Sequence, residues 1–402
     1  MKKLISIVAL AAIAAIFCHT STAFAQSDST FKPHWAFNGQ LFADYYYMMS
    51  ADSVMGKGAN GPLGKSYYEP NSNISSTANT RYYQAFDLRR VQLGANYWFT
   101  KDIIAKVLLE HENGAAANGD VALDAKRVFY AKEASITFQN AIPMGNVIFG
   151  QQATNVFSVD EGLMGYRSLE KSIVDMRGMS EAGSNDLGIQ LVGNFDNDKN
   201  FGYSALISNG NGAKDETDKY KAFTGELNAK FMDKHIVIDV SGDYMDKATV
   251  ASITKIVGTD TTKASNVAQS NSLIKVAAAY TSTPVTVGVV YAMHTLKGQS
   301  NSVAGADADQ SGLSIFARGQ IIPKQLNVFA RFDIFDPDTK ANDNASGRKE
   351  NFIIAGLDWM PDEAANVHVI PNIWINTFKD KSSANLDFEG ITVARLTFAY
   401  KF

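Results

Sequence analysis

Apolar and polar side chains alternate with a period of two along most of this chain. The clearest alternating segments are 35–47, 187–195, 223–231, 236–244, 326–334 and 394–402. Successive side chains of a β-strand point to opposite sides, so this pattern is typical of strands with one apolar and one polar face. The alternation therefore predicts an all-β fold.

The connections between these segments also alternate, between short and long. Short turns are expected at 100–102, 141–146, 196–200, 232–235, 282–284, 322–325 and 360–366. Long polar loops are expected at 49–81, 113–126, 153–186, 210–219, 246–270, 295–311, 336–350 and 379–388. These seven turns and eight loops join about 16 strands. Short turns at one end and long loops at the other are the layout of an antiparallel transmembrane β-barrel.

A long run without charged residues lies between Lys275 and Lys297. It is long enough for a membrane helix, but the residues Thr-Ser-Thr-Pro at 281–284 interrupt it. We therefore interpret the run as two apolar strands joined by a short turn.

Alternation alone does not decide whether the apolar face meets lipid or a protein core, and a secreted β-sandwich is the alternative. Two features favour the membrane. The polar faces carry many charges, and aromatic residues gather near strand ends, where interfacial girdles of a barrel lie. These aromatic groups are 45–47, 97–99, Trp359, Phe398, Tyr400 and Phe402.

Composition excludes several other classes of protein. The 402 residues are 46% hydrophobic, 11% aromatic and 19% charged, which is not the composition of a disordered chain. The single cysteine excludes a disulfide scaffold, and the net charge of −4 does not indicate a nucleic-acid-binding protein.

The first 25 residues have the features of a secretory signal peptide. Lys2 and Lys3 precede the apolar segment 4–17, and Ala23-Phe24-Ala25 is a cleavage pattern. An uncleaved anchor is the alternative. We expect residues 1–25 to be cleaved and residues 26–402 to form a single barrel domain of an exported protein.

The alternating register assigns charged residues to the lumen. The expected cations are Arg90, Lys106, Lys230, Lys275, Arg318, Arg331 and Arg395. The expected acids are Asp44, Glu110, Glu112, Glu133, Glu226, Asp239, Asp243, Asp333 and Asp358. Cations and acids are mixed, so we expect a polar, water-filled lumen without one dominant sign of charge.

Two positions break the register. Arg89 and Arg90 are adjacent, and the apolar positions change from even to odd numbers across them. A β-bulge near 88–90 would bring both guanidinium groups into the lumen. Lys132 is the second exception, and we expect it at an interface, with its amine reaching the headgroups.

Three segments resemble a known family. Phe86-Asp87-Leu88-Arg89-Arg90-Val91-Gln92-Leu93-Gly94 resembles the Arg-Arg signature of the phosphate-selective porins of the O and P type. Segments 147–151 and 187–190 resemble the family's next block, and the ending Phe398-Ala399-Tyr400-Lys401-Phe402 is similar to that of outer-membrane barrels in general. The resemblance implies a Gram-negative outer-membrane porin that forms a homotrimer with its third long loop in the pore. It also implies that Phe402 is read by the barrel assembly machinery.

The long loop 153–186 is the candidate constriction. It carries Asp160, Glu161, Arg167, Glu170, Lys171, Asp175, Arg177 and Glu181, and 158–179 has partly helical spacing. We expect it to fold into the barrel, with an external lid as the alternative. We further expect Arg89, Arg90, Arg318, Arg331 and Arg395 to face Asp160, Glu161 and Glu170, and small polar solutes or ions to pass without energy input.

Catalytic and metal-binding signals are weak. The nearest pair for a barrel lipase or protease is His294 with Asp307, and no cofactor, catalytic residue or metal ligand is expected. An outer-membrane enzyme remains the second functional hypothesis, and an adhesive or structural barrel plugged by its loops is the third.

Overall fold

The computed structural model describes residues 31–50, 82–112, 128–181, 183–253, 264–299, 307–339, 348–361, 366–380 and 390–402. The expected signal peptide, 1–25, lies outside the described residues. The strands are β1 (His34–Ser50), β2 (Gln84–Trp98), β3 (Ile103–Glu112), β4 (Tyr130–Ile142), β5 (Gly145–Ala153), β6 (Asn185–Asn194), β7 (Phe201–Ser208), β8 (Ala222–Phe231), β9 (Ile236–Ile253), β10 (Ala264–Thr281), β11 (Val285–Lys297), β12 (Ala308–Ile322), β13 (Leu326–Asp336), β14 (Arg348–Trp359), β15 (Val367–Asp380) and β16 (Ile391–Lys401).

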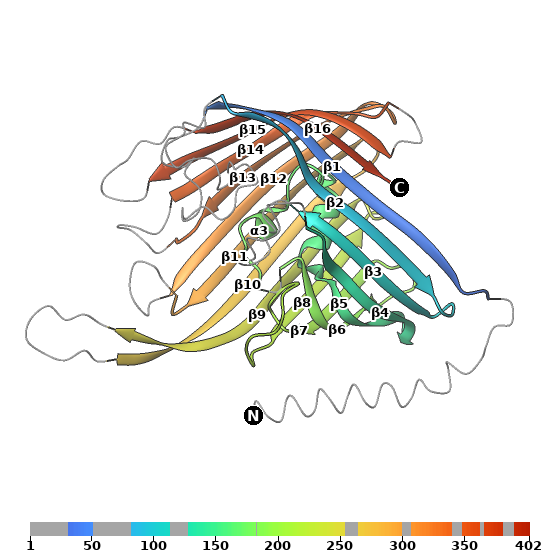
Figure 1. Ribbon diagram of the computed structural model, residues 1–402, viewed down its shortest axis with the longest axis vertical. Coiled ribbons are helices and arrows are strands. Elements are labelled where there is room, and N and C mark those ends of the chain that lie inside the picture. Colours follow the sequence, from blue (N-terminus) through green and yellow to red (C-terminus); the bar gives the residue numbers. More distant parts are fainter. Residues whose placement is uncertain are drawn as a thin grey trace, which may run out of the picture.

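Within the described residues, each strand pairs antiparallel with its sequence neighbours, and β1 pairs with β16 (Figure 1). At this seam the amide of Gly39 donates to the carbonyl of Phe402 at 3.0 Å, and the amide of Phe402 donates back at 3.0 Å. Closure satisfies the backbone groups that an open sheet edge would leave unpaired. The predicted barrel of 16 strands is therefore confirmed.

The strands around the longest hairpins extend further than expected. β9 and β10 run through much of the loop predicted at 246–270, and β11 and β12 shorten the loop predicted at 295–311. Figure 1 shows the β9–β10 hairpin projecting beyond its neighbours. The extended ends of these strands are rich in polar residues. They still pair with each other, because strand pairing outside a membrane does not require an apolar face.

The outer wall of the barrel is apolar. Phe86 is 85% exposed, Phe37 is 73% exposed and Leu227 is 57% exposed, while the polar residues next to them in sequence point inward. An exposed, continuous apolar wall is unstable in water but matches the hydrocarbon of a bilayer. This arrangement excludes the β-sandwich, in which these side chains would fill a dry core.

Aromatic rings gather on the outer wall near both ends of the first strands. The ring centroids of Trp35 and Tyr97 lie 4.5 Å apart near the short turns, and those of Tyr45 and Phe86 lie 4.9 Å apart nearer the long loops. Such rings suit the two membrane interfaces, because one edge contacts water and the other contacts lipid. Among the described residues, no helix is long and apolar enough to cross a membrane.

Candidate functional site

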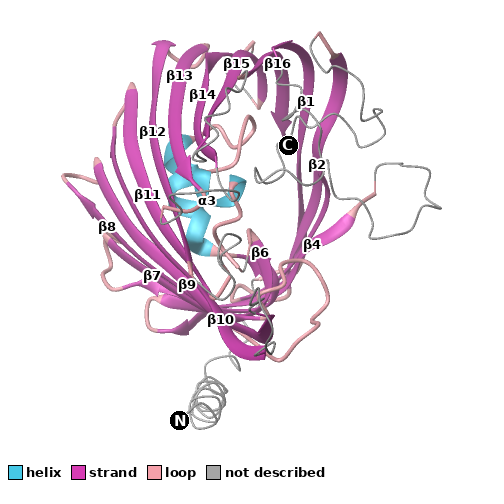
Figure 2. Ribbon diagram, turned by 90° about the vertical axis from the view of Figure 1, so that its left-hand side faces the viewer, coloured by secondary structure: helices cyan, strands magenta, loops and turns pink. Residues whose placement is uncertain are grey.

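The connection between β5 and β6 lies inside the barrel and carries the described helices (Figure 2). They are the 3-10 helix η2 (Asn155–Phe157) and the α-helices α2 (Ser158–Met164) and α3 (Ile173–Met176). We call residues 154–181 the internal loop. It contacts β8 to β12 on their inner faces. The structure thus places the internal loop inside the barrel, as expected, and not above it as an external lid.

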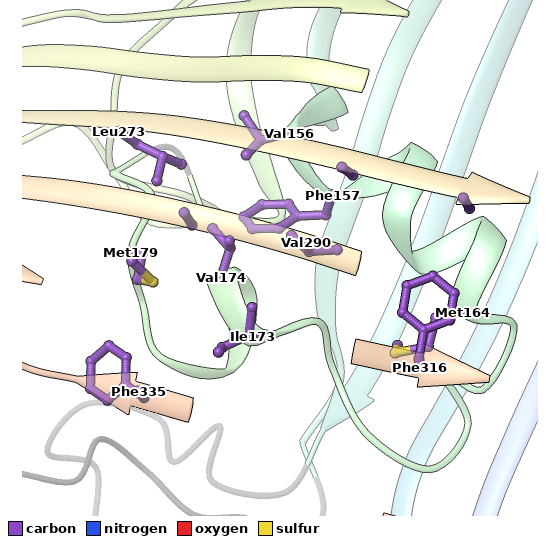
Figure 3. Close-up of a cluster of buried hydrophobic side chains, with 13 residues drawn as sticks. Val156, Phe157, Met164, Ile173, Val174, Met179, Leu273, Val290, Phe316 and Phe335 are labelled. Carbon is purple, nitrogen blue, oxygen red and sulfur yellow. The ribbon is translucent and has the colours of Figure 1, made fainter. Parts of the chain in front are cut away.

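An apolar cluster attaches one side of the internal loop to the wall (Figure 3). Val156, Phe157 and Ile173 of the loop pack among inward side chains of β10 to β13, including Leu273 and Phe316. A second cluster joins Leu169 and Met176 to Phe352, Ile354 and Trp374 of β14 and β15. The loop is thus held by buried apolar area as well as by charge.

These clusters correct the expectation of a uniformly polar lumen. The inner face from β10 to β16 is partly apolar, because the internal loop covers it and water does not reach it. The sequence carried a signal for this arrangement. The charge-free run at 276–296 is apolar on both faces of two strands, and such strands require cover on both sides.

Lys275 of β10 joins the internal loop to the wall by charge. Its Nζ lies 2.7 Å from Oδ1 of Asp160 in α2 and 3.2 Å from Oδ2 of Asp239 in β9, and it donates to the carbonyl of Val156. The Lys275 and Asp239 side chains are fully buried, and that of Asp160 is 1% exposed. We call these three residues the loop latch. Burial raises the pKa of Asp160, and Lys275 opposes this shift.

A bulge in β2 brings two arginines into the lumen, as predicted. Phe42 of β1 pairs with Arg90 and Ala43 pairs with Leu88, so Arg89 is the extra residue. Both arginines are buried. Arg89 Nε lies 2.7 Å from Asp44 Oδ2, and its guanidinium also donates to the Ser168 carbonyl of the internal loop.

A second bulge changes the position expected for Lys132. Leu108 pairs with Glu133 and Leu109 pairs with Ala131, so Lys132 is left over and points into the lumen. Its Nζ lies 2.7 Å and 2.8 Å from the two carboxylate oxygens of Glu110. The expectation of an interfacial lysine is wrong, because the bulge reverses the facing of this position and a buried carboxylate lies within reach.

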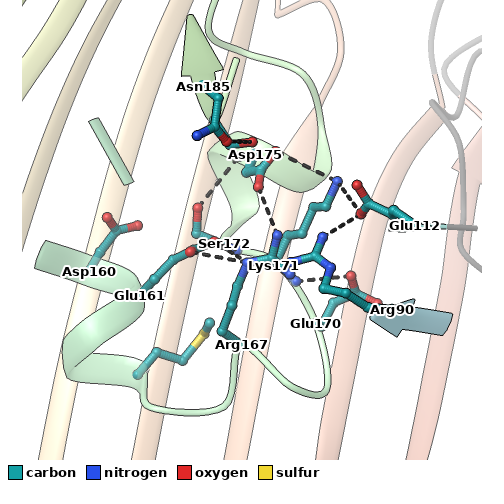
Figure 4. Close-up of polar contacts among 12 residues, drawn as sticks. Arg90, Glu112, Asp160, Glu161, Arg167, Glu170, Lys171, Ser172, Asp175 and Asn185 are labelled. Carbon is teal, nitrogen blue, oxygen red and sulfur yellow. Dashed lines mark hydrogen bonds and ion pairs between the residues drawn. The ribbon is translucent and has the colours of Figure 1, made fainter. Parts of the chain in front are cut away.

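Where the internal loop meets β3, cations and acids alternate over a small area (Figure 4). Arg167 Nε lies 3.0 Å from Glu161, and its Nη2 lies 3.4 Å from Asp175. Lys171 Nζ lies 2.9 Å from Glu112, which also pairs with Arg90 at 2.5 Å. We call these six residues of the loop and the wall the mixed-charge patch: Arg90, Glu112, Glu161, Arg167, Lys171 and Asp175. The Arg167, Lys171 and Glu161 side chains keep about a fifth of their surface exposed.

Four more of the expected lumen cations are also inside, with diverse partners. Lys106 pairs with Glu133 at 2.6 Å on the wall and is 41% exposed. Arg331 bonds Asp333 of its own strand and the Lys171 carbonyl, the latter at 2.5 Å. Arg395 donates to Asn372 at 2.8 Å, and Arg318 donates to the Leu163 carbonyl at 3.1 Å.

The expected facing of wall arginines and loop acids is therefore largely wrong. Asp160 pairs with a lysine, and Glu161 pairs with Arg167 of the same loop. The wall arginines take wall acids or loop carbonyls, except that Arg395 donates to the amide oxygen of Asn372. Glu170 comes nearest to the expectation. Burial raises its pKa, and the charges of Arg89 and Arg331 oppose that shift. Loop carbonyls compete well for arginine, because a guanidinium has five donors.

The sequence pattern does not mark Glu350 as a lumen acid, because this residue falls at the end of the loop predicted at 336–350. It lies at the start of β14, is buried, and pairs with Arg177 of the internal loop. The candidate catalytic pair does not form. His294 Nδ1 lies 2.9 Å from Gln310 and Asp307 accepts from the Gly298 amide at 2.9 Å. Among the described residues, no group of His, Cys, Asp and Glu side chains is placed to hold a metal ion.

No family model matches the chain, and no curated protein matches it significantly. Solved structures do match. The outer membrane channel DcaP of Acinetobacter baumannii has a TM-score of 0.59 at 11% identity, over 94% of this chain and 100% of that one. The anion-selective porin from Comamonas acidovorans has a TM-score of 0.58 at 12% identity, over 92% and 100%. OmpT of Vibrio cholerae has a TM-score of 0.58 at 14% identity, over 94% and 100%. The phosphate-selective family is not confirmed, and the chain has the fold of Gram-negative outer-membrane porins and channels.

Proposed function

We propose that this chain is a porin of a Gram-negative outer membrane, through which small hydrophilic solutes and ions diffuse passively. The observation that carries the proposal is a closed barrel with an apolar outer wall, polar inner faces and a charged loop in the lumen. Gln190, Ser204, Thr224 and Glu226 exemplify the polar inner face of β6 to β8. A barrel of this design encloses water.

The mixed-charge patch is the proposed selectivity element of the pore. Arg167, Lys171 and Glu161 are partly exposed, so passing ions would meet both signs of charge at once. Two unit charges about 4 Å apart interact by about 4 kcal/mol at an effective dielectric constant of 20. Opposed charges at such spacing orient polar solutes and give weak preference between anions and cations.

The lumen cations divide into two proposed roles. Lys106, Arg318, Arg167 and Lys171 retain exposed surface or line a cavity and would contact solutes. A second set is buried in ion pairs or hydrogen bonds and would brace the internal loop and wall. These residues are Arg89, Arg90, Lys275, Arg331, Arg395 and Arg177. Passage of anions, phosphate included, is the finer form of the proposal and rests on the first set.

Single-channel recording in a planar bilayer tests the function. Purified protein is expected to give discrete conductance steps, and the reversal potential in a salt gradient measures its ion preference. Phosphate added to chloride reports phosphate preference. Absence of steps would contradict the porin, and turnover of added lipid or peptide would support the enzyme hypothesis. Absence of both would support a structural barrel.

The outer wall and the chain end suggest further partners. The apolar band would contact outer-membrane lipid, and Phe402, 60% exposed beside the seam, is the proposed signal for the assembly machinery. We also propose a homotrimer; OmpT of Vibrio cholerae has been solved in a trimer form. Chemical cross-linking of the purified protein is expected to yield a trimer band, and only monomer would contradict this.

A further inference from the structure

A cavity of about 380 Å³ lies at the short-turn end of the barrel, beneath the internal loop. The turn between β10 and β11 forms one side, β12 and β13 form another, and Tyr166 of the loop borders it. In a barrel of this layout the short turns face the periplasm. The volume is at the lower end of the range typical of small-molecule sites.

Arg318 is the cation of this cavity, and the internal loop fixes its orientation. Its Nε donates to the Leu163 carbonyl at 3.1 Å. Its guanidinium also lies against Gly165, where an added Cβ would come within 2.9 Å of one terminal nitrogen. Gly165 has a φ of 78°, which favours glycine. The backbone thus holds one edge of the guanidinium.

The charge balance at Arg318 differs from that of the latch and the mixed-charge patch. Lys275, Arg90 and Lys171 each pair with carboxylates. Arg318 has no carboxylate partner among the described residues. No residue that lines the cavity is acidic, although the buried carboxylate of Asp358 accepts from two lining residues, Tyr166 at 3.3 Å and Asn327 at 3.4 Å. The terminal nitrogens of an arginine form a fork that suits a carboxylate or a phosphate.

Besides Arg318, the lining includes His235 at the β8–β9 turn and several neutral polar side chains. Thr286 provides a hydroxyl, which lies 3.0 Å from that of Thr281, and Gln320 provides an amide. Asn327 of β13 is the cross-strand neighbour of Gln320. The Oδ1 of Asn327 is buried and accepts no hydrogen bond from the described residues, whereas its amide nitrogen donates to Asp358 at 3.4 Å. A buried acceptor without a partner is costly. A rotation of the Asn327 amide that turns Oδ1 into the cavity would let a ligand hydroxyl donate to it.

We propose that this cavity binds a small hydroxylated organic anion, with the oxyanion on Arg318 and hydroxyl groups on Asn327, Gln320 and Thr286. This inference rests on the proposed function only for the route by which the ligand arrives. It names a solute class that the porin would concentrate at its periplasmic mouth.

Isothermal titration of the full chain in detergent tests the site, with gluconate as the probe. Gluconate is expected to bind the wild type, and neutral glucose is expected to bind at least tenfold more weakly, because it lacks the charge-assisted hydrogen bond. Inorganic phosphate lacks the hydroxylated body and is also expected to bind more weakly than gluconate. Equal affinity for phosphate would overturn the proposed hydroxyl contacts.

Matched variants identify the cation. Arg318→Gln is expected to weaken gluconate binding at least tenfold, and Arg318→Lys is expected to retain an intermediate affinity, since it keeps the charge without the fork. Lys324→Gln removes the same charge from an exposed turn at the same end and is expected to change nothing. Equal gluconate affinity in the wild type and Arg318→Gln, or a loss equally large in Lys324→Gln, would overturn the proposal.

Conductance separates this proposal from the porin itself. Gluconate added on the short-turn side of a bilayer is expected to reduce the current of the wild type and not of Arg318→Gln. Conductance without gluconate binding would refute the site and leave the porin standing. Binding without any conductance would support the site and refute the porin.

Discussion

The loop latch predicts that Lys275→Met releases the internal loop. The substitution leaves Asp160 and Asp239 buried without their shared cation. Loss of one partner of a buried ion pair costs about 3–5 kcal/mol, because the remaining charge stays out of water. Each 1.4 kcal/mol changes an equilibrium tenfold, so the undocked population is expected to rise about a hundredfold to a few thousandfold.

Limited trypsin digestion measures this population. The loop carries three trypsin sites, after Arg167, Lys171 and Arg177, and each of these side chains pairs with an acid when the loop is docked. Cleavage of a transiently opened segment follows the population of the open form when closing is fast. Mass spectrometry of the fragments should therefore show faster cleavage in Lys275→Met, while the barrel stays intact.

Three comparisons sharpen the result. Asp160→Asn leaves Lys275 paired with Asp239, so its loop is expected to be cut more slowly than that of Lys275→Met. The double variant with both changes buries one unpaired carboxylate instead of two and is expected to fall between them. Lys106→Met removes a lysine that pairs with Glu133 of the wall, and should leave cleavage unchanged. Wild-type cleavage rates in Lys275→Met would refute the latch, since the apolar clusters alone would then hold the loop.

The remaining predictions concern the pore, the outer wall and assembly. Burial raises the pKa of Glu161, while Arg167 opposes the shift. Acidification therefore neutralises this acid at a higher pH than an ordinary glutamate, and the reversal potential is expected to move toward anion preference as the pH falls. Glu161→Gln should mimic this change at neutral pH and remove part of the pH dependence. Leu227→Lys places a charge on the outer wall and should cost about 2–4 kcal/mol of the free energy of folding, measured by denaturant titration of the protein in lipid vesicles. Thr137→Lys on the inner face should cost much less, and equal costs would contradict a lipid-facing outer wall. Removal of Phe402 takes away two seam hydrogen bonds and the terminal aromatic, and is expected to lower the heat-modifiable barrel recovered from outer membranes; unchanged recovery would argue against an assembly role.

The sequence by itself determined the barrel. The period of two shows which side chains share a face of a strand. The number of short and long connections gives the number of strands, and their alternation indicates a barrel. It also located the bulge at Arg89, because one inserted residue reverses the parity of every apolar position after it. Local patterns suffice for these features, since each depends on neighbours along one strand.

The tertiary structure alone decided which charges meet. Lys275 and Asp160 are 115 residues apart, and nothing in either strand or loop pattern indicates their contact. Lys132 enters the lumen because its bulge faces Glu110, and the apolar inner wall is stable because the internal loop covers it. Alternation distinguishes two faces of a strand, but what covers a face depends on segments that folding brings from elsewhere in the chain.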